Sequence, residues 1–180
     1  MFENSFQAEG NKKVTDNKED MTRVNRIWNH PDYQKSLHNI EDLEKERIFC
    51  GHDARHLLDT ARLAYIEDLE LSLGISKEII YAAALLHDIG RGLQYTDGVP
   101  HHEGGVKIAA PILSACGFSD RETEEILEAI GGHRDVSVKT GKDLAGILYR
   151  ADKRSRCCFS CPAEAECNWS MEKKIMRLTV

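Results

Sequence analysis

The sequence predicts an all-α protein, a compact single-domain bundle of helices, and three observations support this fold class. Apolar residues recur at helical spacing along most of the chain, and no segment shows a convincing alternation of apolar and polar residues that a strand would need. Glycine and proline stand mainly where the periodic segments stop. The length of 180 residues, of which 41% are hydrophobic, suits one domain with one sizeable core.

Two helices are expected between residues 21 and 43, with Pro31 in the first turn of the second helix. The apolar positions of these two helices are Val24, Ile27, Trp28, Tyr33, Leu37, Ile40 and Leu43. A longer helix is expected over residues 52–73, and Gly74 can end it. The apolar positions of this longer helix are Leu57, Leu58, Ala61, Ala64, Tyr65 and Leu69.

A strongly apolar helix is expected next, with Ser76 as its cap and His87 near its end. Gly90 and Gly92 are expected to end this helix. The pair Asp97-Gly98 indicates a turn.

Three further helices are expected in the second half of the chain. They cover residues 106–116, interrupted by Pro111, residues 119–130, and residues 144–151. The predicted architecture is therefore a helical bundle.

The chain divides into three parts. Residues 1–20 are polar and are expected to form a flexible N-terminal tail, residues 21–156 form the helical domain, and residues 157–180 form a cysteine-rich C-terminal extension. No apolar run approaches the roughly 20 residues that cross a bilayer, and the first 20 residues lack the hydrophobic segment of a secretory signal. We therefore expect a cytoplasmic protein with no membrane partner.

The charge pattern narrows the partners further. Acidic residues outnumber basic ones by 30 to 24, and no run of lysine and arginine offers a footprint for a nucleic-acid backbone. A small-molecule substrate is the better expectation, and the oligomeric state is left open.

Metal-ligating residue types form the main functional signal. His87-Asp88 ends the apolar stretch 79–86, where packing alone would favour another hydrophobic residue. The full candidate set for binding Fe, Mn, Zn or Ni is His56, His87, Asp88, His101, His133 and Asp152. Neighbours on a helix point about 100° apart, so His87 and Asp88 can address one ion from two directions, or Asp88 can bridge two ions. His101 and His133 would then serve the second ion.

Residues 50–152 resemble the HD-domain metal-dependent phosphohydrolase superfamily. The motifs that carry the resemblance are His56-Leu57-Leu58-Asp59-Thr60-Ala61, Leu85-Leu86-His87-Asp88-Ile89-Gly90-Arg91 and Ala151-Asp152. The resemblance implies that His56, His87, Asp88 and Asp152 coordinate one metal, and that His101 and His133 correspond to the two histidines that members with a second metal add. The chain departs mildly from the family pattern at Thr60 and at Gly105-Val106.

Two ligand assignments have alternatives. His52 lies four residues before His56 and would share its helix face, but the residues after His56 fit the family better, which leaves His52 as a group facing the substrate. His102 competes with His101 in the same way, and Gly105 favours His101. His30 and His38 are expected to be surface residues.

The resemblance and the ligand set together predict hydrolysis of a phosphate ester or anhydride in a nucleotide or small metabolite. Two ions lower the pKa of a shared water, supply hydroxide and neutralise the charge that develops at phosphorus, with Asp88 as the bridge. Arg91 and Lys153 could stabilise the phosphoryl oxygens, although either could equally be a solvated cation at a helix end. His52 or a metal-bound water would protonate the leaving oxygen.

Two other functions are compatible with the same residues. Histidine-rich HD sites with two irons also occur in oxygenases that cleave C–C or C–P bonds. A non-catalytic sensor could bind a nucleotide or a metal and use the cysteine-rich extension for a partner. The intact ligand set makes the sensor less favoured than a hydrolase.

The six cysteines form a second signal. Cys158-x-x-Cys161 followed by Cys167 has the opening of a metal knuckle, and Cys50 or Cys157 could supply a fourth thiol for structural zinc or an iron–sulfur cluster. The alternative is a tail of reduced thiols. Cys116 is expected to be a core thiol.

Overall fold

The computed structural model describes residues 21–178, and the regular elements among them are all helical, which confirms the predicted fold class. The predicted N-terminal tail lies outside the described residues. The α-helices are α1 (Thr22–Trp28), α2 (Pro31–Leu43), α3 (Ala54–Leu71), α4 (Lys77–Leu86), α5 (Arg91–Asp97), α6 (His101–Cys116), α7 (Asp120–Gly132) and α8 (Leu144–Arg154). Short 3-10 helices follow as η1 (Val136–Thr140), η2 (Cys158–Ser160) and η3 (Glu164–Glu166).

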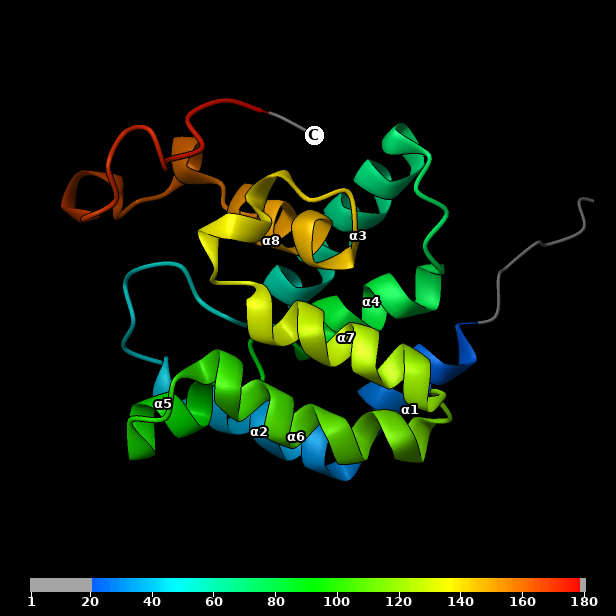
Figure 1. Ribbon diagram of the computed structural model, residues 1–180. Coiled ribbons are helices and arrows are strands. Elements are labelled where there is room, and N and C mark those ends of the chain that lie inside the picture. The colour runs from blue at the N-terminus through cyan, green and yellow to red at the C-terminus, as the bar shows by residue number, and fades with distance from the viewer. Residues whose placement is uncertain (1–20, 179–180) are drawn as a thin grey trace, which may run out of the picture.

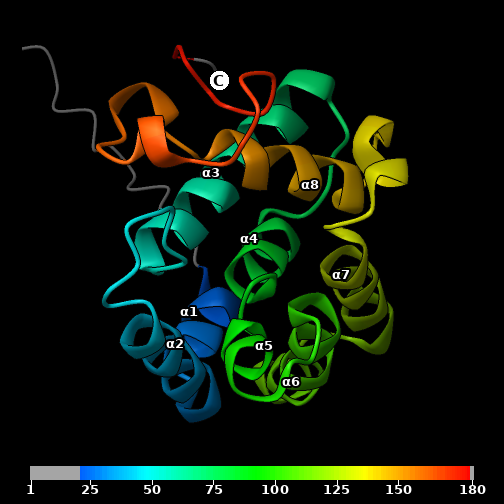
Figure 2. The same ribbon diagram turned by 90° about the vertical axis from the view of Figure 1, so that its left-hand side faces the viewer.

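Helix α4 lies at the centre of the bundle, and the other helices are arranged around it (Figures 1 and 2). Its residues 82–86 are completely or almost completely buried, as expected for a helix that is apolar on all sides. Helices α3 and α8 pack on one side of α4, and α7 and α1 pack on other sides. Helix α6 packs against both α7 and α5. The residues that follow α4 are therefore delivered into the middle of the molecule.

Side-chain caps fix the starts of the two helices that carry the outermost candidate ligands. Asp53 accepts a hydrogen bond from the backbone N–H of His56 at 3.0 Å, which begins α3. Asp143 accepts one from Gly146 at 2.8 Å, which begins α8. Such caps typically contribute about 1 kcal/mol each, and here they also set the register of His56 and Asp152.

Glu67 holds α8 against α3. Its carboxylate, 7% exposed, pairs with Arg150 at 2.5 Å and with Arg154 at 3.1 Å, both on α8. A buried carboxylate that lost these partners would be strongly destabilising. The two cations therefore keep the two helices in register beside α4.

The expectation that Gly90 and Gly92 end the apolar helix is wrong. Helix α4 ends at Leu86, a turn follows, and the two glycines start a separate helix, α5, that the sequence analysis missed. A Cβ on Gly90 would lie 2.2 Å from the carbonyl oxygen of His101, so this glycine permits a close approach of α6 instead. The turn at Gly98 is confirmed, with a left-handed φ of 71°.

Helix α6 also differs from expectation, because it begins at His101 and runs without interruption through Pro111. Pro111 is exposed, so water can satisfy the carbonyl group that loses its helical partner. Two positions assigned to apolar helix faces point outward, with Leu43 46% and Leu69 59% exposed. Both lie at or near the ends of their helices, beyond the part that the bundle covers.

The C-terminal extension packs beside α3 and α8 and contains little regular structure beyond η2 and η3 (Figure 1). Among its described residues, Cys158 and Ala163 are the buried hydrophobic ones. No helix within residues 21–178 has both the length and the apolar character that crossing a membrane requires.

Candidate metal centre

All six candidate ligands come together at the end of α4. His56 lies on α3 and Asp152 on α8, and both face His87 and Asp88, which follow α4 directly. The second pair of histidines comes from the start of α6 and the residue after α7. Each of the six is buried: His56, His87, Asp88, His101, His133 and Asp152.

Asp88 is shared between two groups of potential ligand atoms. One group comprises His56, His87, Asp88 and Asp152, the other comprises Asp88, His101 and His133, and the atoms within each group lie within 4.8 Å of one another. Each oxygen of Asp88 faces a different group.

The distances from Asp88 and Asp152 show this division. Oδ2 of Asp88 lies 3.2 Å from Nε2 of His87 and 3.4 Å from Nε2 of His56. Oδ1 of Asp88 lies 3.3 Å from Nε2 of His101 and 3.8 Å from Nε2 of His133. Oδ1 of Asp152 completes the first group, 3.6 Å from Nε2 of His56 and 3.8 Å from Nε2 of His87.

Backbone carbonyls set the tautomers of two histidines. Nδ1 of His87 donates to the carbonyl oxygen of Ala84 at 2.7 Å, and Nδ1 of His133 donates to that of Ile130 at 2.6 Å. In both cases the carbonyl belongs to the residue three positions earlier in the preceding helix. A neutral ring held in this way directs the lone pair of Nε2 into the site, as a metal ligand requires.

Side chains set the tautomers of the other two histidines, His101 and His56. Nδ1 of His101 donates to the side-chain oxygen of Gln94 on α5. Nδ1 of His56 lies 3.0 Å from the hydroxyl of Ser155, whose own proton is donated to the carbonyl oxygen of Asp152. The hydroxyl therefore accepts from His56, and all four Nε2 atoms face the interior of the site.

Burial keeps three of these rings neutral at physiological pH. It lowers the pKa of His56 and of His133 to about 4 each, and that of His101 to about 3, with nearby cationic groups adding to the effect. Neutral imidazole is the form that binds a metal.

The pKa values of the two carboxyl groups and of His87 shift in the opposite sense, toward the charged form of each group. Burial acts to raise the pKa of Asp88 and of Asp152, but the positive charge of His87, with that of Arg91 beside Asp88 and of Lys153 beside Asp152, outweighs it and holds both pKa values well below the usual range. Burial likewise acts to lower the pKa of His87, and the two carboxylates overcome it and raise that pKa to about 9. The pocket between the carboxylates thus favours a positive charge.

Unpaired buried atoms test whether a metal suits the site. Nε2 of His87 and Oδ2 of Asp88 are both buried and have no hydrogen-bond partner in the described part of the chain. Such atoms are costly to bury unless something satisfies them. A divalent cation would satisfy both, and the mixture of imidazole and carboxylate suits Fe, Mn, Ni or Zn.

His52 lies beside this set without joining either group. Its Nδ1 donates to Oε1 of Glu44 at 2.6 Å, and its Nε2 lies 3.8 Å from Oδ2 of Asp88. Tyr95 on α5 also donates to Glu44, at 2.5 Å, so the carboxylate is fixed from two sides. The geometry favours His56 over His52 as the ligand. His102 is only half-buried and likewise stands outside both groups.

Three cationic side chains touch the two carboxylates. Arg91 donates from Nε to Oδ1 of Asp88 at 3.0 Å, and Nζ of Lys153 lies 2.5 Å from Oδ2 of Asp152. The third, Arg156, is 8% exposed, and its Nη2 lies 3.4 Å from both Oδ1 of Asp152 and Nε2 of His56. Sequence reasoning proposed Arg91 and Lys153 for this region and missed Arg156.

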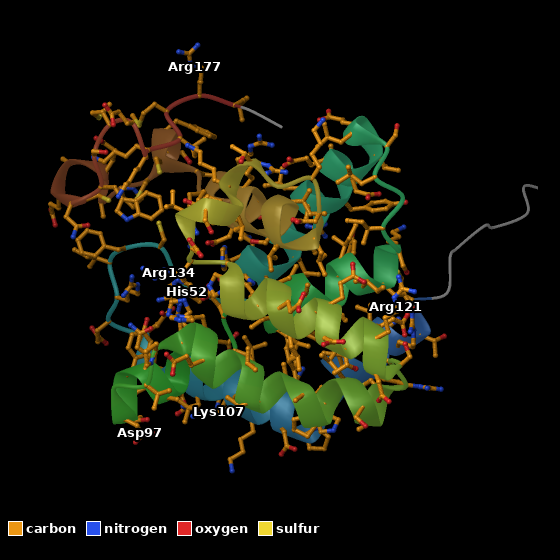
Figure 3. The ribbon with its side chains drawn as sticks, viewed as in Figure 1. His52, Asp97, Lys107, Arg121, Arg134 and Arg177 are labelled. Atoms are coloured by element: carbon orange, nitrogen blue, oxygen red, sulfur yellow. The ribbon has the colours of Figure 1, made fainter. Side chains whose placement is uncertain are left out.

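The residues near the centre that were not predicted differ in how far the sequence indicated them. Arg156 follows Asp152 by four residues, the spacing that places two side chains on one face of a helix, so its position carried a signal. Glu44 and Gln94 stand eight and seven residues from the histidines they hold, at a spacing with no periodic meaning. Figure 3 shows His52 and Arg134 on the side of the molecule where loop 44–53 passes.

The four predicted cysteine ligands lie outside the two groups of His and Asp ligands. Cys50 is on loop 44–53, and Cys158, Cys161 and Cys167 are on the extension. All six cysteines are free thiols, and Cys116 is buried in the core as expected.

A helical bundle that brings a buried His-Asp pair and four further candidate ligands to one point defines a metal-binding helical domain. A family model described as "HD domain" matches residues 53–157, which is more than half of the chain, so the chain belongs to the HD domain family. HD domains bind divalent metals and are typical of metal-dependent phosphohydrolases. The resemblance seen in the sequence motifs is confirmed.

A relative from Clostridium beijerinckii, described as an uncharacterized protein, is 45% identical over 158 residues. The match covers 88% of this chain and 99% of the relative. No solved structure matches the chain significantly.

Proposed function

We propose that the protein is a metal-dependent phosphohydrolase with two metal ions, and that Asp88 bridges them. The observation that carries the proposal is the division of the two Asp88 oxygens between the two ligand groups. His56, His87 and Asp152 would hold one ion with Asp88, and His101 and His133 would hold the other. Two such ions supply a water of lowered pKa and neutralise negative charge at a phosphoryl group.

The charges around the centre favour an anionic substrate. Two divalent ions beside Arg91, Lys153 and Arg156 carry more positive charge than the carboxylates of Asp88 and Asp152 can balance. A buried excess of charge is costly, and a phosphate group would offset it. The excess of positive charge favours a phosphate ester or anhydride over an uncharged substrate.

Arg156 is the best placed of the three cations to contact phosphate. Its Nε is buried and has no hydrogen-bond partner among the described residues, while its Nη1 is held by the carbonyl oxygen of Gly51 at 3.1 Å. With Nη2 on Asp152 as well, the guanidinium is fixed at both terminal nitrogens, and its one unpaired N–H, at Nε, suits a phosphoryl oxygen. Arg91 and Lys153 would add positive charge on other sides of the phosphate group.

His52 enters the proposal as a hydrogen-bond acceptor. Because its Nδ1–H is donated to Glu44, its neutral ring presents a lone pair at Nε2 toward the site. It would orient a water or a substrate hydroxyl near Asp88, instead of protonating the leaving oxygen as the sequence analysis suggested. Glu44 and Tyr95 would fix its orientation.

The substrate we propose is a small phosphorylated metabolite, with a nucleotide as the leading candidate, and the proposed location is the cytoplasm. The net charge of −6 disfavours a nucleic-acid strand as the partner.

A phosphate-release screen tests the proposed reaction. The full chain, purified without oxygen, is assayed for phosphate released from nucleotides and sugar phosphates, and for the linear product of cyclic dinucleotides, with added Mn²⁺, Fe²⁺ or Ni²⁺. We expect release with at least one substrate, loss of release in Asp88→Ala, and no loss in His38→Ala, which removes an exposed histidine on α2. Oxygen consumption without phosphate release would favour the di-iron oxygenase instead. Nucleotide binding without turnover would favour a sensor.

A further inference from the structure

The C-terminal extension has few interactions of its own to hold it in place. Between residues 157 and 178 its regular structure is limited to η2 and η3, and its buried hydrophobic residues are Cys158 and Ala163. One backbone hydrogen bond, from Phe159 to Ile175 at 3.0 Å, connects its two arms. Small units with so little core usually depend on a metal or a disulfide for their order.

Thiols from two distant parts of the chain meet in this region. Nη1 of Arg156 donates to the carbonyl oxygen of Gly51 at 3.1 Å, so the segment that carries Cys50 lies against the segment that carries Cys158, 108 residues later in the chain. Burial raises the pKa of Cys50, and the nearby thiols of Cys158 and Cys161 add to the effect. Nζ of Lys174 is held by the carboxylate of Glu164 at 2.6 Å, and this hydrogen bond, with smaller effects of the nearby thiols of Cys167 and Cys158, raises the pKa of Lys174. Cys158 is therefore the common neighbour of the group.

Local turns fix the backbone around the three cysteines of the extension. The N–H of Cys161 donates to the carbonyl oxygen of Cys158 at 3.2 Å, which closes the Cys-x-x-Cys turn. The N–H of Cys167 donates to Glu164 at 3.2 Å, which closes a second turn. Tight turns around a Cys-x-x-Cys pair are a common frame for thiolate ligands.

We propose that Cys50, Cys158, Cys161 and Cys167 bind an iron–sulfur cluster that ties the C-terminal extension to loop 44–53. This site is separate from the His/Asp centre and does not depend on the proposed hydrolase function. Cys157, the other candidate for the fourth ligand, is exposed, whereas Cys158 is buried and Cys50 is partly buried.

The spacing of the thiols favours a cluster over a single zinc ion. In the described part of the chain, the groups of three or more ligand atoms within 4.8 Å of one another contain no cysteine. A tetrahedral zinc with Zn–S bonds of about 2.3 Å requires sulfurs about 4 Å apart. A cluster binds each cysteine through a different iron, so it accepts a wider arrangement of four thiols.

The position of the cluster would also affect the His/Asp centre. His52 follows Cys50 by two residues and Arg156 precedes Cys158 by two, and Arg156 already bridges the two segments through the carbonyl oxygen of Gly51. A cofactor that joins these segments would hold both side chains in place beside the metal centre.

Acid-labile sulfide is the decisive readout, because the His/Asp centre contains none. The full chain is purified without oxygen, reconstituted with iron and sulfide, and assayed for iron, sulfide and visible absorption. We expect about four sulfides per chain together with thiolate-to-iron absorption, as a [4Fe–4S] cluster would give. Cys158→Ser and Cys161→Ser should lose both signals, and Cys50→Ser should lose most of them. The control Cys157→Ser should keep them.

Two results would overturn the cluster. One is the absence of labile sulfide from the reconstituted wild-type chain. The other is one equivalent of zinc bound through thiolates, lost in Cys158→Ser and retained in the His87→Ala, Asp88→Ala double variant. Neither result depends on phosphate release, so failure of the cluster and failure of the proposed hydrolase can be told apart.

Discussion

Nε2 of His101 lies 3.1 Å from Nε2 of His133, although each ring donates its Nδ1–H to another group. With both rings neutral, two lone pairs face each other at hydrogen-bonding distance, and no proton is available between them. This contact is unfavourable in isolation. A cation bound by both nitrogens, and by Oδ1 of Asp88, would make it favourable.

Removal of the His133 side chain should therefore weaken the binding of one metal ion and leave the binding of the other unchanged. We expect His133→Ala to lower the metal content of the anaerobically purified protein by one ion per chain relative to wild type, because His56, His87 and Asp152 still surround the first site with Asp88. Elemental analysis measures the content, and His38→Ala is the control. Two ions retained at unchanged affinity would contradict the second site.

Arg156 should bind the substrate through its phosphate. The change Arg156→Lys keeps the positive charge and removes the planar fork, so we expect KM for the phosphate substrate to rise about 10–100-fold with metal content unchanged. Steady-state kinetics and elemental analysis check both points. Arg121→Lys, at an exposed position on α7 (Figure 3), should leave KM as it is. An unchanged KM in Arg156→Lys would remove this arginine from the binding site.

Glu44 should make stability depend on pH in the acid range. Burial acts to raise its pKa, but hydrogen bonds from His52 and Tyr95 lower it to about 2, and Arg47 lies 4.0 Å away. A carboxyl with a depressed folded pKa stabilises the protein above its ordinary pKa and loses that effect as pH falls toward the folded value. The contribution is at most about 3 kcal/mol.

Urea unfolding of Glu44→Gln as a function of pH measures this contribution. The difference in unfolding free energy between wild type and Glu44→Gln should be largest near neutral pH and should shrink between about pH 5 and pH 2. A difference that stays constant across this range would show that the carboxylate charge is not the cause.

Gly90 should be intolerant of a side chain. A Cβ there would lie 2.2 Å from the carbonyl oxygen of His101 and 2.3 Å from the backbone nitrogen of Gly105, so α6 would have to move. We expect Gly90→Ala to destabilise the fold by about 3 kcal/mol and to weaken the second metal site. Gly131→Ala is the matched control, since its nearest neighbour is 3.7 Å away, and it should stabilise α7 by about 0.5–1 kcal/mol. Equal denaturation midpoints would rule out the steric explanation.

The sequence allowed prediction of the elements that follow from periodicity and of the ligands that follow from a motif. Helix α4 is apolar on all sides, and a polar His-Asp pair at its end marks the centre of the molecule. The grouping of His101 and His133 with Asp88 was expected from their ligand types and from the family resemblance, and their positions in space agree with it.

The parts that could not be predicted depend on contacts between distant segments. Helix α5 is short, and its glycines look like helix stops until the approach of α6 is known. Glu44 has no sequence relation to His52, because loop 44–53 folds back to bring them together. Arg156 lies beyond the expected end of its helix, although its spacing from Asp152 pointed to the same face.

The central claim is that Asp88 is the shared ligand of two metal ions in a phosphohydrolase. The most direct test is elemental analysis of Asp88→Ala beside wild type, both purified without oxygen and assayed for phosphate release. We predict that Asp88→Ala contains two fewer metal ions per chain than wild type, whatever iron the cysteines hold, and that turnover is lost with them. A variant that kept both ions and full activity would contradict the account.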